Sequence, residues 1–442
     1  MLFKFLKYVQ PTHYFSLKRN DGTSIFPIAS ELPEVVLQQL QEDNNYSSKM
    51  ATAYDLSFQA VLKGYTGDAP TYRAVERLPV KDEYRFLRKN FHPIWVLYVL
   101  LLRVCSFHNP FTELGGFLRT RKVRRVPYTA TPLKNDSWEN FNASLTAQNP
   151  LVTVVIPTLN RYKYLAQVLR DFEVQSYTNF EIVVVDQSQP FNPDFYAPFK
   201  LHINVVRQEE PALWLARNTA IEQAKGEIIA LSEDDVRIPK YWIETHLKCL
   251  DYFQADISAG VFFPEGEKIP QNRSFFSIAS QFATGNAMLY KDVFRKVKLF
   301  DRQFEKQRMG DGEFGLRCYL QSLKSISNPL AYCEDIKAEV GGLRQMGSWD
   351  AFRTKKLFAP RPIPSVLYLY RRYYGNRSAV LALLKSVPPS IIPYRFKRNK
   401  MLLLLGIFVS VFLLPLISIQ VFISWRKATK KIVEGPLIRS LD

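Results

Sequence analysis

The alternation of short β-branched strands with amphipathic helices between Leu151 and Leu231 constrains the fold of this chain most. Four apolar runs have strand length, at 151–156 (LVTVVI), 181–185 (EIVVV), 203–206 (INVV) and 227–231 (EIIAL). Apolar residues with helical spacing at 165–172 and 216–224 separate them; Asn160 can cap the first helix and Gly226 ends the second. We therefore expect an α/β fold with a mostly parallel, doubly wound sheet, whose ligands bind at the carboxyl ends of its strands.

Three consecutive acids, Glu233, Asp234 and Asp235, follow the fourth expected strand. Carboxylates this close repel one another unless a positive group neutralises them. A hard divalent cation such as Mn²⁺ or Mg²⁺ can do so with oxygen ligands, and can also bridge to the two phosphates of a nucleotide sugar. A solvated acidic loop would explain the same residues without any ligand, and the run alone does not separate the two.

The length of 442 residues allows two or three domains. Residues 1–148 mix helical patterns with basic and irregular stretches, and we expect them to form an N-terminal accessory region. Within it, Ile94–Leu102 is far shorter than the roughly 20 residues that span a bilayer, so it predicts a buried or interfacial helix. The basic cluster Arg119–Arg125 predicts a solvated loop or a contact with phosphates or lipid headgroups.

The C-terminal part divides into three expected segments. Residues 361–400 mix aromatic and aliphatic residues with Arg and Lys, which predicts amphipathic interfacial helices. Residues 401–425 carry no charge and exceed the roughly 20 residues of a spanning helix, which predicts a transmembrane segment, or a re-entrant one because Pro415 lies near the middle. Residues 426–442 form a basic tail. Four positive charges on each flank leave the orientation open.

The formal charge is +18, of which residues 361–442 contribute +12. Because these basic residues surround the apolar run, we expect membrane lipids as a partner and no nucleic acid; no helix-turn-helix, zinc-finger or RNA-binding signature accompanies them. The four cysteines show no disulfide-like or metal-binding spacing, which predicts reduced thiols. We expect the protein at the cell membrane, with its main body on the cytoplasmic side.

Five short motifs follow one another along the chain: TVVIPTLNR (153–161), VVVDQSQ (183–189), LSEDDV (231–236), TGNAMLY (284–290) and GDGEFGLR (310–317). In this order they resemble the family 2 glycosyltransferases with the glycosyltransferase-A fold. The resemblance covers about residues 150–345, under half of the chain. It implies a catalytic domain at about 149–350 that transfers a sugar with inversion, from a UDP- or dTDP-sugar and with Mn²⁺ or Mg²⁺.

The resemblance also implies individual roles. Asp186 would accept a hydrogen bond from the base, which favours uracil or thymine, although Gln187 stands where relatives carry a second acid. Asp235 would be the direct metal ligand, with Asp234 nearer the ribose or the metal waters and Glu233 in the first acidic position. The loop after the first strand would lie against the nucleotide and supplies Pro157, Thr158, Asn160 and Arg161.

Three further residues complete the candidate nucleotide-sugar site: Arg217, Asn286 and Arg344. Asn286 is the best polar candidate in TGNAMLY. Arg344 belongs to a GGLR element (341–344) that resembles a late family motif near the donor phosphates, where it could offset leaving-group charge. A surface arginine explains Arg344 nearly as well. His246 shares a helix with Trp242, and we expect it to serve packing.

Asp311 matches the catalytic base of the family, although the Glu that usually precedes it is Gly310 here. Inverting transfer needs a carboxylate that removes the acceptor proton as the oxygen attacks the anomeric carbon. Gly310 and Gly312 would leave room for an acceptor near the backbone. The alternative is that Asp311 only caps the following helix.

From the sequence we expect inverting transfer of a sugar from a nucleotide diphosphate to a hydroxyl of a lipid-linked or cell-surface glycan. A polyprenyl-phosphate glycosyltransferase is an alternative, because its acceptor is already an anion and needs no base. A catalytically inactive scaffold that binds nucleotides or glycans is another, and the intact acids at 234, 235 and 311 argue against it.

Overall fold

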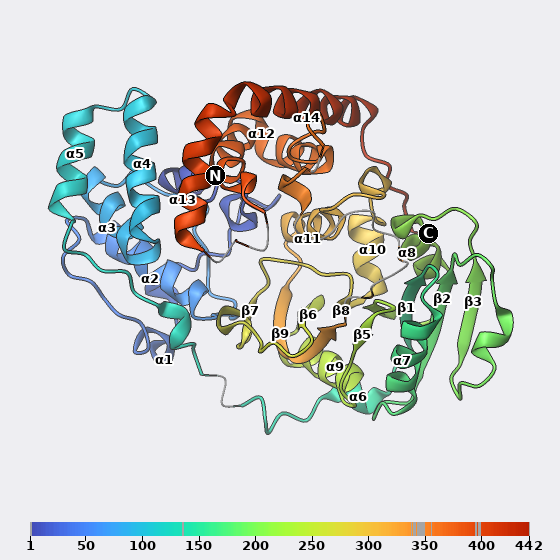
Figure 1. The fold of residues 1–442 in the computed structure, drawn as a ribbon. Helices are drawn as coiled ribbons and strands as arrows, with labels where there is room; N and C mark the ends of the chain where they lie inside the picture. Colours follow the sequence, from blue (N-terminus) through green and yellow to red (C-terminus); the bar gives the residue numbers. More distant parts are fainter. Residues whose placement is uncertain are drawn as a thin grey trace.

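The computed structural model describes residues 2–134, 137–336, 338, 342, 350–354, 356–393, 396 and 399–441. Its centre is one mixed sheet in the order β3-β2-β1-β4-β8-β6-β9-β5, with β7 paired to β9 (Figure 1). The strands are β1 (Val152–Thr158), β2 (Phe180–Asp186), β3 (Ile203–Arg207), β4 (Ile228–Ser232), β5 (Val236–Arg237), β6 (Ile257–Pro264), β7 (Ser277–Ile278), β8 (Asn286–Tyr290) and β9 (Ser325–Asp335).

The four strands expected from the alternation are confirmed, and they form the parallel part of the sheet, β3-β2-β1-β4. The expectation of a mostly parallel sheet is wrong for the rest. The TGNAMLY strand β8 lies antiparallel between β4 and β6, and β5 and β7 are antiparallel to β9. Only β6 and β9 pair parallel in that half. The sheet is therefore mixed, and its parallel half keeps the ligand edge of a doubly wound fold.

Helices cover both faces of the sheet because successive residues of a strand point to opposite faces. Val154 and Ile156 of β1 pack with α7 (Tyr162–Glu173) and α9 (Trp242–Tyr252), which α6 (Ser144–Gln148) joins. Val155 enters a second core on the other face. The helices of that face are α8 (Leu213–Gln223), α10 (Lys291–Val297) and α11 (Gly310–Leu320).

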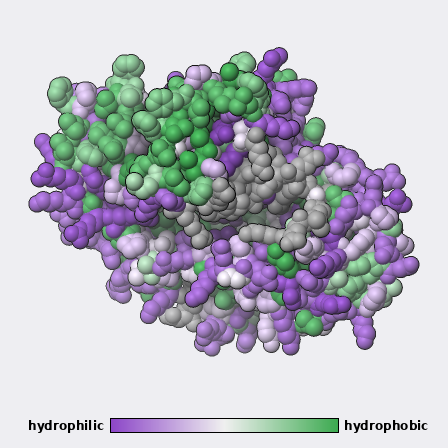
Figure 2. Space-filling model, in the orientation of Figure 1, coloured by the Kyte–Doolittle hydropathy of each residue, from purple (hydrophilic) through white to green (hydrophobic). Residues whose placement is uncertain are grey.

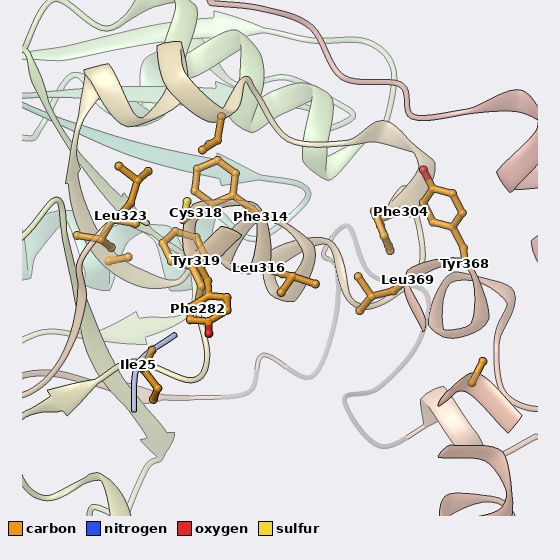
Figure 3. Close-up of a cluster of buried hydrophobic side chains, with 14 of the residues drawn as sticks. Ile25, Phe282, Phe304, Phe314, Leu316, Cys318, Tyr319, Leu323, Tyr368 and Leu369 are labelled. Carbon is orange, nitrogen blue, oxygen red and sulfur yellow. The ribbon is translucent and has the colours of Figure 1, made fainter. Parts of the chain in front are cut away.

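The N-terminal region is helical and shares this second core. Its aromatic centre gathers Phe3, Phe26, Tyr54, Phe58 and Phe86, with ring centroids as close as 4.8 Å. Figure 3 shows Ile25 from this region near Phe282, and Tyr368 from the C-terminal part beside Phe304. Its helices are α1 (Glu34–Leu37), α2 (Lys49–Leu62), α3 (Val80–Asn90), α4 (Pro93–Cys105) and α5 (Pro110–Arg119).

The C-terminal region begins with α12 (Pro364–Ser386), which is kinked at Gly375. Val366, Leu367 and Tyr368 are fully buried and join the cores, so the expectation that all of 361–400 is interfacial is wrong for this first half. The apolar sequence of α12 packs against protein there because α14 (Leu414–Glu434) lies along it. The α14 helix also extends nine residues beyond the expected end of the apolar segment at 425.

Residues 401–425 do not form one straight helix. They are divided between α13 (Lys400–Phe412) and α14, which meet at an angle of 87°. Pro415 lies in the first turn of α14, where its missing N–H is tolerated, and it could not continue α13. Within the described residues, this bent pair is long and apolar enough to cross a bilayer, whereas no single helix is.

Candidate functional site

The carboxyl ends of β1, β2 and β4 meet at one edge of the sheet. Thr158, the last residue of β1, pairs in register with Asp186, the last residue of β2. Asp234 follows β4 by two residues, and its Oδ2 accepts a hydrogen bond from Thr158 Oγ1 at 2.8 Å. The structure thus brings three separate sequence motifs to one place, which we call the donor edge.

Asp234 and Asp235 share one cationic group at the donor edge. Arg161 Nη1 lies 3.0 Å from Asp234 Oδ1 and 2.9 Å from Asp235 Oδ2. Burial, reinforced by the neighbouring Asp235 charge, raises the pKa of Asp234 to about 7. Burial also raises the pKa of Asp235, against the opposing effect of Arg161. One guanidinium therefore does not fully offset the cost of two charges in this place, and a further positive charge would be bound favourably.

Glu233 turns toward a different arginine. Its carboxylate lies 2.8 Å from Arg217 Nη2, and the Arg217 side chain is completely buried. Gly285 of the TGNAMLY motif packs directly on Glu233, because a Cβ at Gly285 would come within 2.8 Å of Glu233 Cγ. The structure thus places Arg217 behind the acidic run, as the partner of its first member.

Asp186 is completely buried at the end of β2. Its Oδ2 accepts hydrogen bonds from the hydroxyls of Tyr162 and Tyr196, both at 2.8 Å, and its Oδ1 accepts one from the Ser188 N–H at 2.9 Å. A carboxylate can accept about four hydrogen bonds, so these three leave one acceptor position of the covered Asp186 side chain unused. The neighbouring Gln187 Oε1 accepts from the Ala212 N–H and ties the β2 loop to α8.

Asn160 does not cap α7, so that expectation is wrong. The helix begins at Tyr162, and no side chain caps it. Asn160 instead adopts a positive φ of 54°, a conformation that Asn tolerates better than most residues. Its Oδ1 accepts from the Gln189 N–H, and its own N–H donates to Ser188 Oγ. Asn160 therefore joins the β1 and β2 loops beside Pro157 and Asp186, where it shapes the donor edge.

Asp311 lies in the first turn of α11 and is partly exposed, but it is not the N-cap of that helix. Met309 holds the cap position, and Asp311 Oδ1 accepts a hydrogen bond from the adjacent Gly312 N–H at 2.8 Å. Asp311 is therefore not the N-cap residue, although its carboxylate still satisfies one first-turn N–H of α11, so the capping alternative stays open. The carboxylate keeps most of its acceptor capacity, and an acid in the first turn also suits the helix dipole.

The surroundings of Asp311 correct one expectation and add two residues. The space beside Gly310 is filled, because a Cβ there would lie 2.3 Å from the Trp214 ring; it does not serve an acceptor. Tyr14 from the N-terminal region donates a hydrogen bond to the Gly312 carbonyl. Sequence patterns gave no signal for Tyr14 or Trp214, because each contact joins distant segments. The buried indole N–H of Trp214 has no hydrogen-bond partner among the described residues.

Asn286 is fully used inside the protein. Its Oδ1 accepts from Trp242 Nε1 and lies 3.0 Å from His246 Nε2, and its Nδ2 donates to two backbone carbonyls. No hydrogen-bonding capacity remains for a nucleotide sugar, so the structure moves Asn286 from the donor edge to the interior. His246 is completely buried in the same network, which confirms its packing role.

The GGLR element lies mostly outside the described residues, and Arg344 is among those that are not described. Gly342 is described. It has a positive φ of 91°, its N–H donates to the Leu159 carbonyl, and a Cβ there would lie 2.4 Å from Arg161 Nη2. Glycine is thus required at 342, because the backbone rests directly on the guanidinium that joins Asp234 to Asp235.

The donor edge fits a hard divalent cation in part. Among the described residues, no group of three or more His, Cys, Asp and Glu side chains could hold a metal ion. Asp234 and Asp235 nevertheless offer carboxylate oxygens around a shared positive group, and Mg²⁺ is typically held by one or two carboxylates together with substrate phosphates. The two residues therefore fit a cation that a diphosphate helps to bind.

The chain matches known glycosyltransferases over its central part. Residues 153–306 match the family model described as glycosyl transferase family 2, about a third of the chain. The glycosyltransferase GlyA of Streptococcus pneumoniae is 29% identical over 162 residues, which cover 36% of this chain and 22% of that protein. The poly(ribitol-phosphate) β-N-acetylglucosaminyltransferase TarS of Staphylococcus aureus is 26% identical over 207 residues, which cover 42% of this chain and 36% of TarS.

A crystal structure of S. aureus TarS residues 1–349 in complex with UDP-GlcNAc aligns at a TM-score of 0.42 and 17% identity, covering 64% of this chain and 92% of that one. The chain spans only about a fifth to a third of the length of GlyA and TarS. The segment 153–306 that matches the family 2 model contains the donor edge.

Proposed function

We propose that this protein is an inverting glycosyltransferase that moves a sugar from a UDP- or dTDP-sugar to a hydroxyl of a lipid-linked or cell-surface glycan. The observation that carries the proposal is the pair of buried Asp234 and largely covered Asp235, which shares Arg161 at the carboxyl edge of the parallel half of the sheet, within a region that matches glycosyltransferase family 2. Ligands of open α/β sheets bind outside this edge. TarS, one of the relatives, acts by its name on poly(ribitol-phosphate), which supports a cell-surface polymer as acceptor.

The donor edge offers one group for each part of a nucleotide diphosphate. Asp186 keeps one acceptor position, which suits the imide N–H of uracil or thymine. Asp235, with Asp234, would hold Mn²⁺ or Mg²⁺, and the bound ion would neutralise charge on the departing diphosphate. Arg161 occupies the position between these carboxylates, so a cation that binds there competes with it. Thr158 fixes the Asp234 carboxylate by its hydrogen bond.

Asp311 is the proposed general base. Its partly exposed carboxylate makes one hydrogen bond, to the backbone of its own helix, and so remains able to accept the proton of an incoming hydroxyl. Tyr14 and Trp214 hold the start of α11 from two sides. Their contacts position the backbone that carries Asp311. Proton transfer in the transition state requires a base held in a defined orientation.

We also propose that the protein works at the cytoplasmic face of the cell membrane. The exposed apolar side chains of α13 and α14 support this location, as do the basic residues around them. The same surface favours one alternative activity, transfer to a polyprenyl phosphate, whose acceptor oxygen needs no base. Replacement of Asp311 distinguishes the two, because only the hydroxyl acceptor depends on that residue.

A screen of UDP- and dTDP-sugars for nucleotide release, with purified membranes and added Mn²⁺, tests the proposal. We expect release with at least one donor and its loss in excess EDTA. The matched variants are Asp235→Asn, which should be inactive, and Glu227→Gln, which removes an exposed acid at the opposite, amino end of β4 and should be active. Activity that survives both EDTA and Asp235→Asn would refute the metal site. Nucleotide binding without turnover would favour an inactive scaffold.

A further inference from the structure

Two helical units expose large apolar side chains to solvent. The first is the hairpin of α4 and α5 in the N-terminal region. Val96, Val99 and Leu100 of α4 face the core, whereas Leu97 and Leu101 on its other side are exposed. The turn is more unusual, because Phe107 is 98% exposed and Phe111 is 85% exposed. Contiguous exposed apolar surface of this kind typically marks an interaction site.

The second unit is the elbow between α13 and α14. Phe408, Val411, Phe412 and Leu414 surround the 87° bend, and all are exposed, Phe412 by 71%. Gly406 lies on the inner side of α13, where a Cβ would come within 2.4 Å of Ile392. One side of α13 therefore packs against protein, and the elbow presents the other side to the surroundings.

The hairpin and the elbow form one surface, which we call the apolar face. In Figure 1, α4, α5 and α13 rise toward the same side of the molecule, and Figure 2 shows a broad hydrophobic area over them. The helix α12 connects the two units, because Lys385 Nζ lies 5.1 Å over the Trp95 ring of α4 and donates to the Val9 carbonyl. The segment after α12, the 3₁₀ helix Pro388–Ile391, packs on α13.

The exposed part of the apolar face lacks acids. Within 93–118 the single acid is Glu113, which is buried against Arg103 and Tyr84. The segment 401–425 has none. Basic residues instead follow the end of α5, where Arg121, Lys122, Arg124 and Arg125 are all exposed, and Lys400 is exposed at the start of α13. The apolar residues at the hairpin turn and the elbow match the lipid tails of a bilayer. The basic residues at the opposite ends of α5 and α13 match its anionic headgroups.

The lengths of α5 and α13 determine how deeply these helices could enter a bilayer. At 1.5 Å per residue, the ten residues of α5 reach about 15 Å and the thirteen of α13 about 20 Å. The hydrocarbon core of a bilayer is about 30 Å thick. From its basic end, each helix therefore reaches about the middle of the bilayer, and the 87° bend turns α14 away from a crossing path.

We propose that the α4–α5 hairpin and the α13–α14 elbow insert together into one leaflet of an anionic bilayer, so that the protein is held on one side and does not span the membrane. This inference rests on the proposed membrane location and is independent of the proposed sugar transfer. It assigns a role to the N-terminal region, whose hairpin forms half of the membrane contact.

Native Cys105 provides a direct probe, because it lies at the end of α4 beside the turn and is exposed, whereas Cys249, Cys318 and Cys333 are buried. The full-length protein would be reconstituted with vesicles of phosphatidylcholine and phosphatidylglycerol in equal parts, and treated with a membrane-impermeant maleimide. We expect the labelling rate of Cys105 to fall by about tenfold or more on vesicle binding, since lipid excludes the reagent. Labelling at an unchanged rate on bound protein would overturn the proposal.

A second experiment removes the contact of the α4–α5 hairpin with the bilayer. Phe107→Asp combined with Phe111→Asp should weaken vesicle binding by about tenfold or more in flotation, because two aromatic side chains leave the lipid. The matched control, Val35→Asp with Val174→Asp, changes two exposed residues outside the apolar face and should bind like the wild type. Because all four positions are solvent-exposed, we expect both variants to fold, and thermal melting checks this.

Two results would contradict the proposal. Equal flotation of the hairpin variant and the wild type would show that α4–α5 does not enter the bilayer. Protection of Cys105 without vesicles, together with sedimentation as a dimer, would show that a second copy covers the apolar face. Both arms are run without nucleotide sugar, so a failure of sugar transfer leaves them unaffected, and their failure leaves the donor edge untested.

Discussion

The donor edge and the apolar face both depart from the usual distribution of residues. Charged side chains are largely covered at the donor edge, and large apolar side chains are exposed at the apolar face. At the donor edge, the charged groups of Asp234 and Arg217 are buried and that of Asp235 is largely covered, and their stability depends on pairing within the protein. At the apolar face, Phe107 and Phe412 are exposed and gain nothing from folding. Buried charges need partners, and exposed hydrophobic groups can take one. The comparison supports a binding role for both regions, with a cation and nucleotide sugar proposed at the donor edge and a lipid bilayer at the apolar face.

The largest expected effect is at the donor edge. Asp235→Asn keeps the shape of the side chain but removes a metal-binding charge, so sugar transfer should fall by at least about a thousandfold, because a metal ion supplies several kcal/mol of charge stabilisation. UDP binding, measured by calorimetry with Mn²⁺, should weaken in parallel, with thermal melting unchanged. Full activity of this variant would remove the reason to regard the edge as a donor site.

Asp311→Asn tests whether the partly exposed acid on α11 belongs to the same machinery. We expect transfer to fall by about 10²–10⁴, the usual contribution of a general base, with donor affinity nearly unchanged. The measurement is acceptor-dependent release of UDP under single-turnover conditions. Because the Asn side-chain oxygen can still accept the hydrogen bond from the Gly312 N–H, the fold should be unaffected. Near-wild-type turnover would place the polyprenyl-phosphate activity first.

Features of the fold and the site that depend on neighbouring residues could be predicted from the sequence, whereas contacts between residues far apart in the chain could not. The strands and the edge that joins Thr158, Asp186 and Asp234 followed from local patterns, because parallel strands align their carboxyl ends. Three expectations about individual residues failed. Asn286 is hydrogen-bonded entirely within the interior. Asn160 takes a left-handed conformation and bonds the β2 loop, and Trp214, almost a hundred positions earlier, fills the space beside Gly310. No local pattern encodes such contacts.

The apolar face shows the same limit. The sequence predicted a transmembrane or re-entrant segment at 401–425, but the 87° bend and the neighbouring α4–α5 hairpin depend on tertiary packing. The run Ile94–Leu102 was too short to span a bilayer and predicted a buried or interfacial helix without deciding between them. Its exposed side acquires meaning only beside α13, which lies about three hundred residues later in the chain.

Arg217→Ala sharpens the energetic side of the comparison. It removes the completely buried guanidinium that faces the largely covered Glu233, which should lower the free energy of unfolding by about 3–5 kcal/mol in urea titrations. The double variant Arg217→Leu with Glu233→Gln should recover part of this loss, because both charges are gone. The exposed pair Arg295–Glu227 is the control, and Arg295→Ala should change the melting temperature little. Equal effects at the two pairs would contradict a special cost of burial at the donor edge.

Arg161→Gln should have a smaller effect, in the opposite direction, on metal binding. Removing the guanidinium that Asp234 and Asp235 share should tighten Mn²⁺ binding without nucleotide by about tenfold, equivalent to about 1.4 kcal/mol. Electron paramagnetic resonance of free Mn²⁺ provides the titration. Weaker binding in this variant would mean that Arg161 organises the carboxylates instead of competing for them.

The smallest expected effect is at the apolar face. Phe111→Ser should change the free energy of unfolding in mild detergent by no more than about 0.5 kcal/mol, because the ring is exposed. The matched change Phe86→Ser, at a completely buried ring, should cost about 3–5 kcal/mol. A large loss at Phe111 would show that the hairpin turn packs against protein, and the contrast between the two regions would fail.

The hydrogen bond from Tyr14 to the Gly312 carbonyl joins positions 298 residues apart, and Tyr319 donates to the Leu17 carbonyl beside it. The expected catalytic domain at about 149–350, which includes α11, is therefore not a portable module. A chimera that exchanges residues 1–148 between homologues would replace the support under α11, and with it the orientation of Asp311, while every motif residue stayed in place. In this protein, recombination at the apparent boundary between accessory and catalytic regions should change the rate of transfer before it changes the donor.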